Sequence, residues 1–251
     1  NNRKRNQIKF EKRMSIICGH GTNSLAYETL TYDISNMGLT YTDVSGSSDI
    51  FDGGAYAVAH DGKMWVAAGI GTNYSLAYSD NGTLWHGIPH SKDQLFTDGA
   101  EGIAYNGKMW VATGNNYASA DMSNILTAYS TDGLCWVPVK SSTRIMTKGF
   151  CVEWGEDMWL VGGHKTLDAN FTGLSTMAYS YNGIDWEYVT GPQVATNVQG
   201  IKWNGKIFVA VGNGGTHTIA WSSNGTNWHG CGDDEFTTAG RGIAYSDKLN
   251  I

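Results

Sequence analysis

This chain of 251 residues has little of several features that mark other classes of protein. It contains only 3 prolines, charged residues make up only 16% of it, and no apolar run approaches the roughly 20 residues that span a bilayer. The formal net charge is −6, and the one basic cluster, residues 3–5, lies in the N-terminal tail. Because phosphate binding needs a basic stripe, we expect no nucleic-acid partner, and we also expect no insertion into a membrane.

Cysteine is equally sparse, and its spacing excludes two kinds of site. The four cysteines, Cys18, Cys135, Cys151 and Cys231, form no Cys-x-x-Cys pair. Three of them fall within expected strands, where cysteine behaves as a small buried apolar residue. Neither a disulfide framework nor a zinc site is therefore expected.

No pattern typical of a metal or a cofactor is found elsewhere. His86 and His90 stand four residues apart, but in a loop that contains Pro89 rather than on a helix. The segment "GDDEF" at 232–236 lacks the ligand at every second position that a calcium loop requires. The segment "GNGG" at 212–215 follows an expected strand, but no helix follows to present its N-terminus to a phosphate. We expect no metal and no cofactor.

Glycine (33 residues), tryptophan (10 residues) and internal repetition are the features that are abundant. The segment "IAYNGKMWVATG" at 103–114 aligns without gaps to three others, at 58–69, 152–163 and 201–212. A weaker copy lies at 8–19 and a truncated one at 243–251, and the copies start 42 to 50 residues apart. Such a period is typical of repeat architectures.

Each repeat also carries an eight-residue second module, which we call the octet. The octets are "YSDNGTLW" (78–85), "YSTDGLCW" (129–136), "YSYNGIDW" (179–186) and "WSSNGTNW" (221–228), with a decayed copy, "ISNMGLTY", at 34–41. Alternating apolar residues joined by short glycine turns are hairpin signals. Four strands in about 48 residues, repeated, are typical of a β-propeller.

The expected fold is therefore all-β, a β-propeller of four-stranded antiparallel blades. After an N-terminal tail (1–7) we expect one domain, 8–251. Its repeat units are 8–52, 53–97, 98–147, 148–196 and 197–238, followed by a closing segment, 239–251. In a five-bladed ring the closing segment would pair with the first unit, whereas in a six-bladed ring the rest of the sixth unit would lie outside this chain. Five octets favour five blades.

The octet resembles the Asp-box of sialidase-type (BNR-like) propellers. The octet reads Ser-x-Asn/Asp-Gly-x-x-Trp, and it has one residue fewer than the Asp-box between the Asn or Asp position and the glycine. Similar arrays are found in uncharacterised bacterial and large-virus repeat proteins. Sialidase activity would imply three arginines that grip a carboxylate and a Tyr–Glu nucleophile pair. The chain has only five arginines, two of them in the tail, so the resemblance implies architecture rather than activity.

Each octet residue has an expected structural role. The Asn or Asp side chain can bond the backbone two residues on, the glycine can adopt a positive φ, and the serine hydroxyl can hold a nearby amide. The tryptophan can bury a large area between blades. A catalytic group would be needed only once, so we interpret the following residues as a structural turn motif: Ser79, Asn81, Gly82, Trp85, Ser130, Asp132, Gly133, Trp136, Ser180, Asn182, Gly183, Trp186, Ser222, Asn224, Gly225 and Trp228.

Loop lengths indicate which face carries function. The two tight turns of each unit keep their length, whereas the stretch from the glycine after the second strand to the octet serine varies from 10 to 17 residues. Variable loops on a rigid scaffold commonly carry binding residues. One candidate group stands two positions before the start of each repeated segment, that is, before residues 58, 103, 152, 201 and 243. In a propeller the first strand of each blade lines the central channel, so these residues would ring its mouth: Tyr56, Glu101, Phe150, Gln199 and Arg241. Their variation suits a ligand site, and equally a position that is simply unconstrained.

A second candidate group lies on the long loops between the second and third strands. Its members are His20, Asn115, Asn116, Tyr117, Asp121, His164, Lys165, Asp168 and Asn170. Exposed aromatic, amide and acidic side chains suit contact with a glycan or a protein, although an ordinary polar loop has a similar composition.

The function we favour is non-enzymatic: a rigid propeller that presents its variable face to a glycan or protein ligand. An extracellular, cell-surface or virion-associated setting is implied by the resemblance alone. One alternative is a glycan-cleaving hydrolase or lyase, with Glu101 and Asp98 as carboxylates at the channel mouth. The other is a structural assembly subunit that binds only its neighbours.

Overall fold

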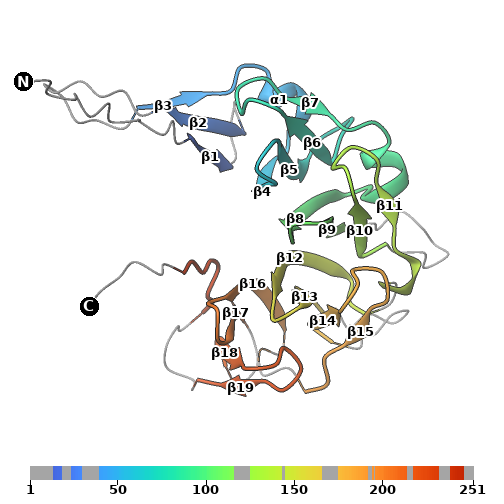
Figure 1. Ribbon diagram of the computed structural model, residues 1–251, viewed down its shortest axis with the longest axis vertical. Coiled ribbons are helices and arrows are strands. Elements are labelled where there is room, and N and C mark those ends of the chain that lie inside the picture. Colours follow the sequence, from blue (N-terminus) through green and yellow to red (C-terminus); the bar gives the residue numbers. More distant parts are fainter. Residues whose placement is uncertain are drawn as a thin grey trace, which may run out of the picture.

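The computed structural model describes residues 14–18, 24–29, 40–115, 125–142, 145–165, 175–191, 194, 196–213, 217–231 and 238–245. Within these residues the chain is almost entirely β-sheet (Figure 1). The first unit contributes β1 (Met14–Cys18), β2 (Leu25–Thr29) and β3 (Thr40–Asp43). The second contributes β4 (Gly54–His60), β5 (Trp65–Ile70), β6 (Leu76–Ser79) and β7 (His86–Gly87). The third contributes β8 (Gly99–Tyr105), β9 (Trp110–Asn115), β10 (Thr127–Ser130) and β11 (Val137–Pro138).

The last two units have the same composition. The fourth contributes β12 (Lys148–Gly155), β13 (Met158–His164), β14 (Met177–Ser180) and β15 (Glu187–Tyr188). The fifth contributes β16 (Asn197–Trp203), β17 (Phe208–Asn213), β18 (Ile219–Ser222) and β19 (His229–Gly230). The described connections between units also hold three short helical segments: α1 (Ser47–Ile50), a π-helix (Ser91–Leu95) and a 3₁₀ turn (Lys140–Ser142).

Every strand pairs antiparallel with the next strand of its own unit, as in β4-β5-β6-β7 and β8-β9-β10-β11. The fourth and fifth units are also linked by one bridge, from His164 to Asn197. In Figure 1 the first strands β4, β8, β12 and β16 lie side by side on the inside of an arc, and β7, β11, β15 and β19 lie on its outside. The fold is thus an all-β propeller of four-stranded antiparallel blades.

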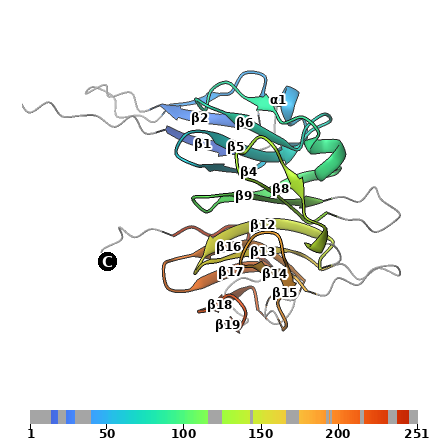
Figure 2. The same cartoon turned by 45° about the vertical axis from the view of Figure 1, so that its right-hand side comes forward.

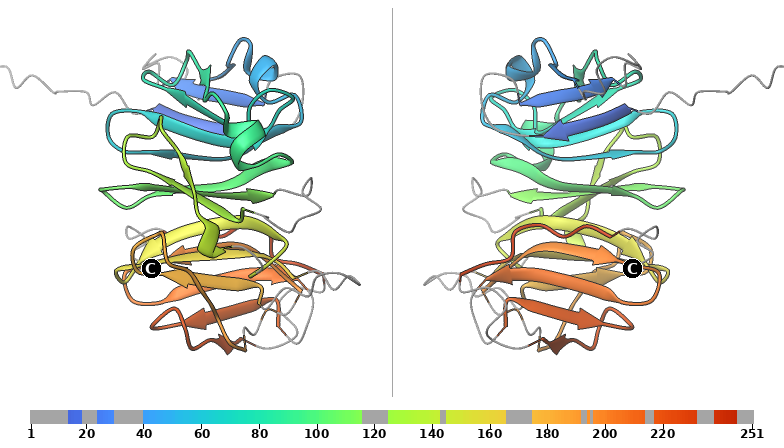
Figure 3. Two further views of the ribbon diagram at one scale, coloured as in Figure 1. Left: turned by 90° about the vertical axis from the view of Figure 1, so that its right-hand side faces the viewer. Right: turned by 90° about the vertical axis from the view of Figure 1, so that its left-hand side faces the viewer.

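The blades stack face to face, as Figures 2 and 3 show, and the core lies between them. Val66 and Trp110 share the buried cluster between the second and third units, and Met158 and Phe208 share that between the fourth and fifth. Because both faces of a blade are covered, its second strand is buried along nearly its whole length, as the burial of every residue of β9 illustrates.

The octets form one repeated set of hydrogen bonds. In the second unit, Ser79 Oγ accepts from Gly82 N at 2.8 Å, and Asn81 Oδ1 accepts from Thr83 N and Leu84 N at 2.9 Å. Gly82 has a φ of 77°, and Trp85 Nε1 donates to its carbonyl at 3.0 Å. The same bonds recur in the next three octets. Each of these four octets is therefore a local turn whose serine and Asn or Asp side chains are already engaged.

The octet turns lie on the same face as the turns between first and second strands. A Cβ added to Gly133 would lie 2.8 Å from Met64 Cε, which belongs to the β4–β5 turn of the preceding unit. A Cβ added to Gly183 would likewise lie 2.9 Å from Met109 Cε. Tight turns of neighbouring blades thus pack together, and the connections of variable length lie at the opposite ends of the strands.

The described part of the closing segment, residues 238–245, is attached to the fifth unit. Ala239 forms a bridge with Asn213, and Gly240 N donates to Gly212 O at 2.9 Å. This repeats the bridge from His164 to Asn197, so the segment occupies the place of a next first strand beside β16. Pairing with the first unit, expected for five-bladed closure, is not formed among the described residues, because the first unit lies at the far end of the arc (Figure 1).

None of the four cysteines, all of which the structure describes, forms a disulfide. Burial raises the pKa of Cys18 and Cys151 to about 12, so both carry their protons at neutral pH. Over the described ranges no helix is long and apolar enough to cross a membrane. Within the same ranges no group of three His, Cys, Asp or Glu side chains is placed to hold a metal ion.

Candidate functional site

The five residues expected at the channel mouth line a single cavity of about 230 Å³. Tyr56, Glu101, Phe150 and Gln199 come from β4, β8, β12 and β16, and Arg241 comes from the closing segment. These strands form the inner side of the arc in Figure 1, so we call this hollow the inner cavity. Five positions spread over 186 residues of sequence thus meet at one place.

A β-bulge holds each of these positions in the four described first strands. The register between β4 and β5 shifts between Ala55 and Ala57, so Tyr56 is the extra residue. The same shift leaves Glu101, Phe150 and Gln199 as extra residues in their strands. A bulged residue has no cross-strand partner, and bulges commonly redirect a side chain beside a functional site. The four blades therefore share one bulged position, and the side chain at this position differs from blade to blade.

Small residues next to the bulges let neighbouring first strands approach closely. A Cβ added to Gly102 would lie 2.8 Å from Thr113 Cγ2 and 3.0 Å from Cys151 Cα on the next blade. A Cβ added to Gly200 would lie 3.3 Å from Ile243 of the closing segment. Close packing of the first strands brings the bulged side chains of adjacent blades within reach of one shared ligand.

Glu101 is the acidic group of the inner cavity. Its Oε1 accepts a hydrogen bond from Asn115 Nδ2 at 2.8 Å. Burial raises the pKa of Glu101, while the bond from Asn115 and the charge of Lys148 act in the opposite direction. The pKa of Tyr56 is raised by burial and then by the charge of Glu101, which shows that the two side chains lie near each other.

His164 joins the cavity through Phe150. The two rings lie 6.4 Å apart between centroids and are nearly parallel, at 21°. Burial, followed by the charge of Lys148, lowers the pKa of His164 and so favours its neutral imidazole. Two residues expected on the variable loops, Asn115 and His164, thus end β9 and β13 and support channel-mouth residues.

The other loop candidates divide into two sets. Lys165 is described, and its backbone N donates to Thr196 O at 3.3 Å. The remaining members, His20, Asn116, Tyr117, Asp121, Asp168 and Asn170, lie outside the described residues.

The chemistry of the inner cavity suits binding of a polar ligand. Its described lining offers one carboxylate, one amide, one guanidinium, a phenol and an aromatic ring. Among the lining residues that the structure describes, Glu101 is the only acid, and Asp98 is not one of them. The carboxylate pair expected for a glycosidase is therefore not formed in this lining.

A pH-dependent stability follows from Glu101. Its pKa in the folded protein is raised above the ordinary 4.5, so its contribution to stability is present below the unfolded-state pKa and lost as pH rises through the folded-state pKa. A Glu101→Gln variant lacks this loss. We expect its free energy of unfolding to increase relative to wild type as pH rises from about 4 to 8. Urea unfolding across this range tests the prediction, and a difference that stays constant with pH would contradict it.

Sequence reasoning missed a second hollow along the same inner strands. It has a volume of about 270 Å³ and is lined by residues two to four positions after the bulges, including His60, Tyr105 and Trp154. Its charges are paired, since Lys202 Nζ lies 2.9 Å from Glu153 Oε1, which also accepts from Trp203 N at 3.2 Å. The sequence does carry a signal for this hollow, because the residues two to four positions after each bulge differ between the repeats.

Solved structures with the same fold share little sequence with this chain. The computationally designed Ika8 protein is 12% identical with a TM-score of 0.53, and the match covers 93% of this chain and 66% of that one. A chain of a nidogen/laminin complex is 10% identical with a TM-score of 0.57, covering 87% and 74%. YjhT is 12% identical with a TM-score of 0.50, covering 74% and 68%.

The likeness to these structures defines the class of protein, an all-β propeller, and at such identities it shows the fold alone. No protein-family model and no curated protein matches the chain.

Proposed function

We propose that this propeller is a non-enzymatic binding module whose inner cavity takes a polar group of a glycan. The observation that carries the proposal is the convergence in one cavity of four bulged residues and Arg241, each with a different side chain. Structural residues of this chain repeat from unit to unit, as the octets do, whereas these positions do not. A repeated scaffold that places a different side chain at each of these shared positions supports selection for a ligand.

A sugar matches the inner cavity better than an apolar ligand. Glu101 and Gln199 can accept hydrogen bonds from sugar hydroxyls, and Gln199 and Arg241 can donate to sugar oxygens. The rings of Tyr56 and Phe150 can cover the apolar face of a pyranose. The volume of about 230 Å³ suits one sugar unit rather than a folded protein surface. A protein loop is the competing ligand, and a chain of a nidogen/laminin complex shares this fold. A surface or virion setting is proposed on the resemblance stated above.

A glycan-array screen with matched variants tests this function. Wild type is expected to bind at least one glycan, and Glu101→Gln and Arg241→Ala each to weaken that binding by about tenfold, or about 1.4 kcal/mol. Lys206→Ala is the control for Arg241→Ala, because it also removes one positive charge but from an exposed tight turn at the other end of the strands. Absence of any glycan signal, or equal loss in all three variants, would reject the proposal.

Glycan cleavage is the second candidate, and one observation favours it. A buried carboxyl with a raised pKa, such as Glu101, is what a general acid needs. The same variant separates the two functions. In an enzyme, Glu101→Gln would abolish product formation while substrate binding persists, whereas in a binding module wild type leaves the bound glycan intact.

A further inference from the structure

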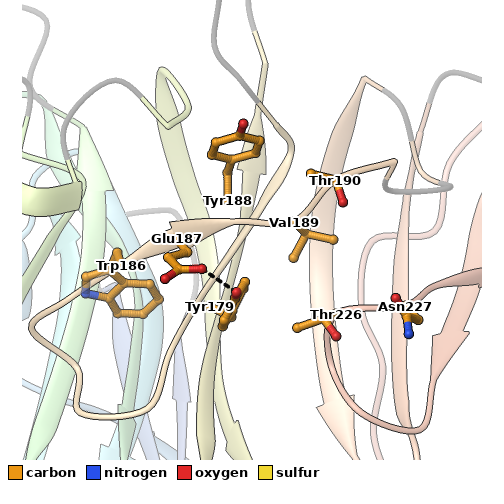
Figure 4. Close-up of a pocket in the computed structure, with 8 residues that line it drawn as sticks. All are labelled: Tyr179, Trp186, Glu187, Tyr188, Val189, Thr190, Thr226 and Asn227. Atoms are coloured by element: carbon orange, nitrogen blue, oxygen red, sulfur yellow. Dashed lines mark hydrogen bonds between the residues drawn. The ribbon is translucent and has the colours of Figure 1, made fainter.

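A third hollow lies on the outer rim between the fourth and fifth units, far from the inner strands along each sheet. It has a volume of about 460 Å³ and is lined by Tyr179, Trp186, Glu187, Tyr188, Val189, Thr190, Thr226 and Asn227 (Figure 4). One wall comes from β14, β15 and the residues after them, and the other from the turn between β18 and β19. We call it the outer groove.

The fourth unit departs from the repeat at this groove. In the second and fifth units, the cross-strand pair after the octet joins an aromatic ring to a histidine, as in Tyr78–His86 and Trp221–His229. The equivalent pair in the fourth unit is Tyr179–Glu187, in which the phenol donates to the carboxylate. The third unit pairs Tyr129 with Val137, so this position varies between units, and Glu187 is its acidic member among the described pairs.

The following position differs as well. The second and fifth units have Gly87 and Gly230 there, and a Cβ on either would overlap a ring, that of Tyr74 or His217. The fourth unit instead has Tyr188, whose side chain is 44% exposed. In Figure 4 its ring stands at the rim of the groove, above Glu187. The third unit has Pro138 at this position, so among the described units the fourth is the one that offers an aromatic ring to a groove here.

One carboxylate of the groove and the backbone of its opposite wall are held in place before any ligand arrives. The bond from Tyr179 to Glu187 Oε2 raises the pKa of Tyr179 to about 12, so the phenol keeps its proton and fixes the carboxylate. On the opposite wall, the backbone amides of Thr226 and Asn227 donate to Asn224 Oδ1 at 3.1 and 2.9 Å, within the octet turn. Fixed polar groups lower the entropic cost of binding.

We propose that the outer groove is a second, independent binding site, for an uncharged sugar unit of a glycan. Glu187 offers an acceptor to adjacent sugar hydroxyls, and the hydroxyl of Thr226 and the amide of Asn227 lie on the opposite wall of the groove (Figure 4). Thr190 adds a hydroxyl to the wall that carries Glu187. The ring of Tyr188 supplies an apolar face for stacking. The described lining contains one carboxylate and no cation, so an acidic sugar is repelled by Glu187 and left without a counter-charge.

Titration calorimetry of the full chain with defined probes tests this site. The neutral probes are maltotriose, cellotriose and triacetylchitotriose, and the acidic probe is 3′-sialyllactose. At least one neutral probe is expected to bind, and Tyr188→Ala and Glu187→Gln each to weaken it by about tenfold. Tyr181→Ala is the matched control, since Tyr181 is a still more exposed tyrosine (67%) of the same blade that does not line the groove. Because Glu187 repels an acidic sugar, any binding of the acidic probe is expected to be unchanged by Tyr188→Ala and Glu187→Gln.

The outcomes separate this site from the inner cavity. If neutral probes bind and only Glu101→Gln weakens them, the outer groove is overturned while the proposed function stands. If Tyr188→Ala and Glu187→Gln weaken binding and Glu101→Gln does not, the outer groove is supported on its own. No binding of any neutral probe at millimolar concentration, or equal loss in Tyr181→Ala, overturns it. Thermal melts accompany each variant, and Thr226→Val tests the opposite wall if Tyr188→Ala does not fold.

Discussion

A Gly163→Ala variant is expected to lose about 3 kcal/mol of folding free energy, a large effect for the addition of one methyl group. A Cβ at this position would overlap the carbonyl oxygen of Lys148 and lie 2.5 Å from Met146 Sδ. Since the carbonyl belongs to the backbone of β12, the overlap can be relieved only by moving that strand. Urea unfolding monitored by tryptophan fluorescence measures the loss.

The same glycine ends the second-strand segment in every complete unit. A Cβ on Gly69 would lie 2.7 Å from Gly54 O, and one on Gly114 or Gly212 would overlap Gly99 O or Asn197 O. Each of these carbonyls precedes a bulged residue of the inner cavity by two positions. The repeated glycine therefore allows the close approach that accompanies the bulge, and Gly163→Ala is also expected to displace Phe150.

Gly242→Ala is the control for this prediction, because a Cβ there meets no atom within 4 Å. Its free energy of unfolding is expected to match that of wild type within about 0.5 kcal/mol. An unfolding midpoint of Gly163→Ala equal to that of Gly242→Ala would show that β12 yields without cost, and the link between glycine and bulge would be wrong.

The repeat predicted the propeller because each unit carries its own strand and turn signals. Alternating apolar residues and glycine turns act locally, so hairpins such as β4–β5 can be predicted without knowledge of their neighbours. The convergence of Tyr56, Glu101, Phe150, Gln199 and Arg241 followed from the same repetition, since equivalent positions of a propeller share one radius and height.

The bulges could not be predicted from the sequence. A bulge normally shows itself as one extra residue relative to a related strand. Here all four described first strands contain it at the same place, so the repeats align without gaps and nothing appears inserted. Register is a property of two paired strands, and the alignment of one strand with its own copies carries no information about it.

The outer groove was missed for a different reason. The octets are uniform in sequence, and the variable loop lengths indicate the opposite face of the blades. The departure in the fourth unit, Glu187–Tyr188, begins one residue after its octet ends. Only the pairing of β14 with β15 and the proximity of the β18–β19 turn make these residues one site.

Five-bladed closure stays a prediction, because residues 246–251 and the start of the first unit lie outside the described residues.

A Trp228→Ala variant is expected to lose about 4 kcal/mol of folding free energy. The Trp228 side chain is only 6% exposed, packs in the cluster between the fourth and fifth units with Met158 and Phe208, and donates from Nε1 to Gly225 O at 2.8 Å. Trp136 occupies the same octet position but is only half-buried at the edge of its cluster. Trp136→Ala is therefore expected to cost distinctly less, and urea unfolding of both variants compares the two.

These two variants also test whether the octet is structural. Each octet completes its own interface between blades, and its Ser and Asn or Asp side chains are engaged within their own turn. Loss of one tryptophan should therefore lower stability while the protein that remains folded keeps its affinity at the inner cavity, which no octet residue lines. Unchanged unfolding midpoints combined with lost glycan binding would instead assign the octet a direct role in the ligand site. A purely structural tryptophan can lower glycan binding only by lowering the stability of the fold.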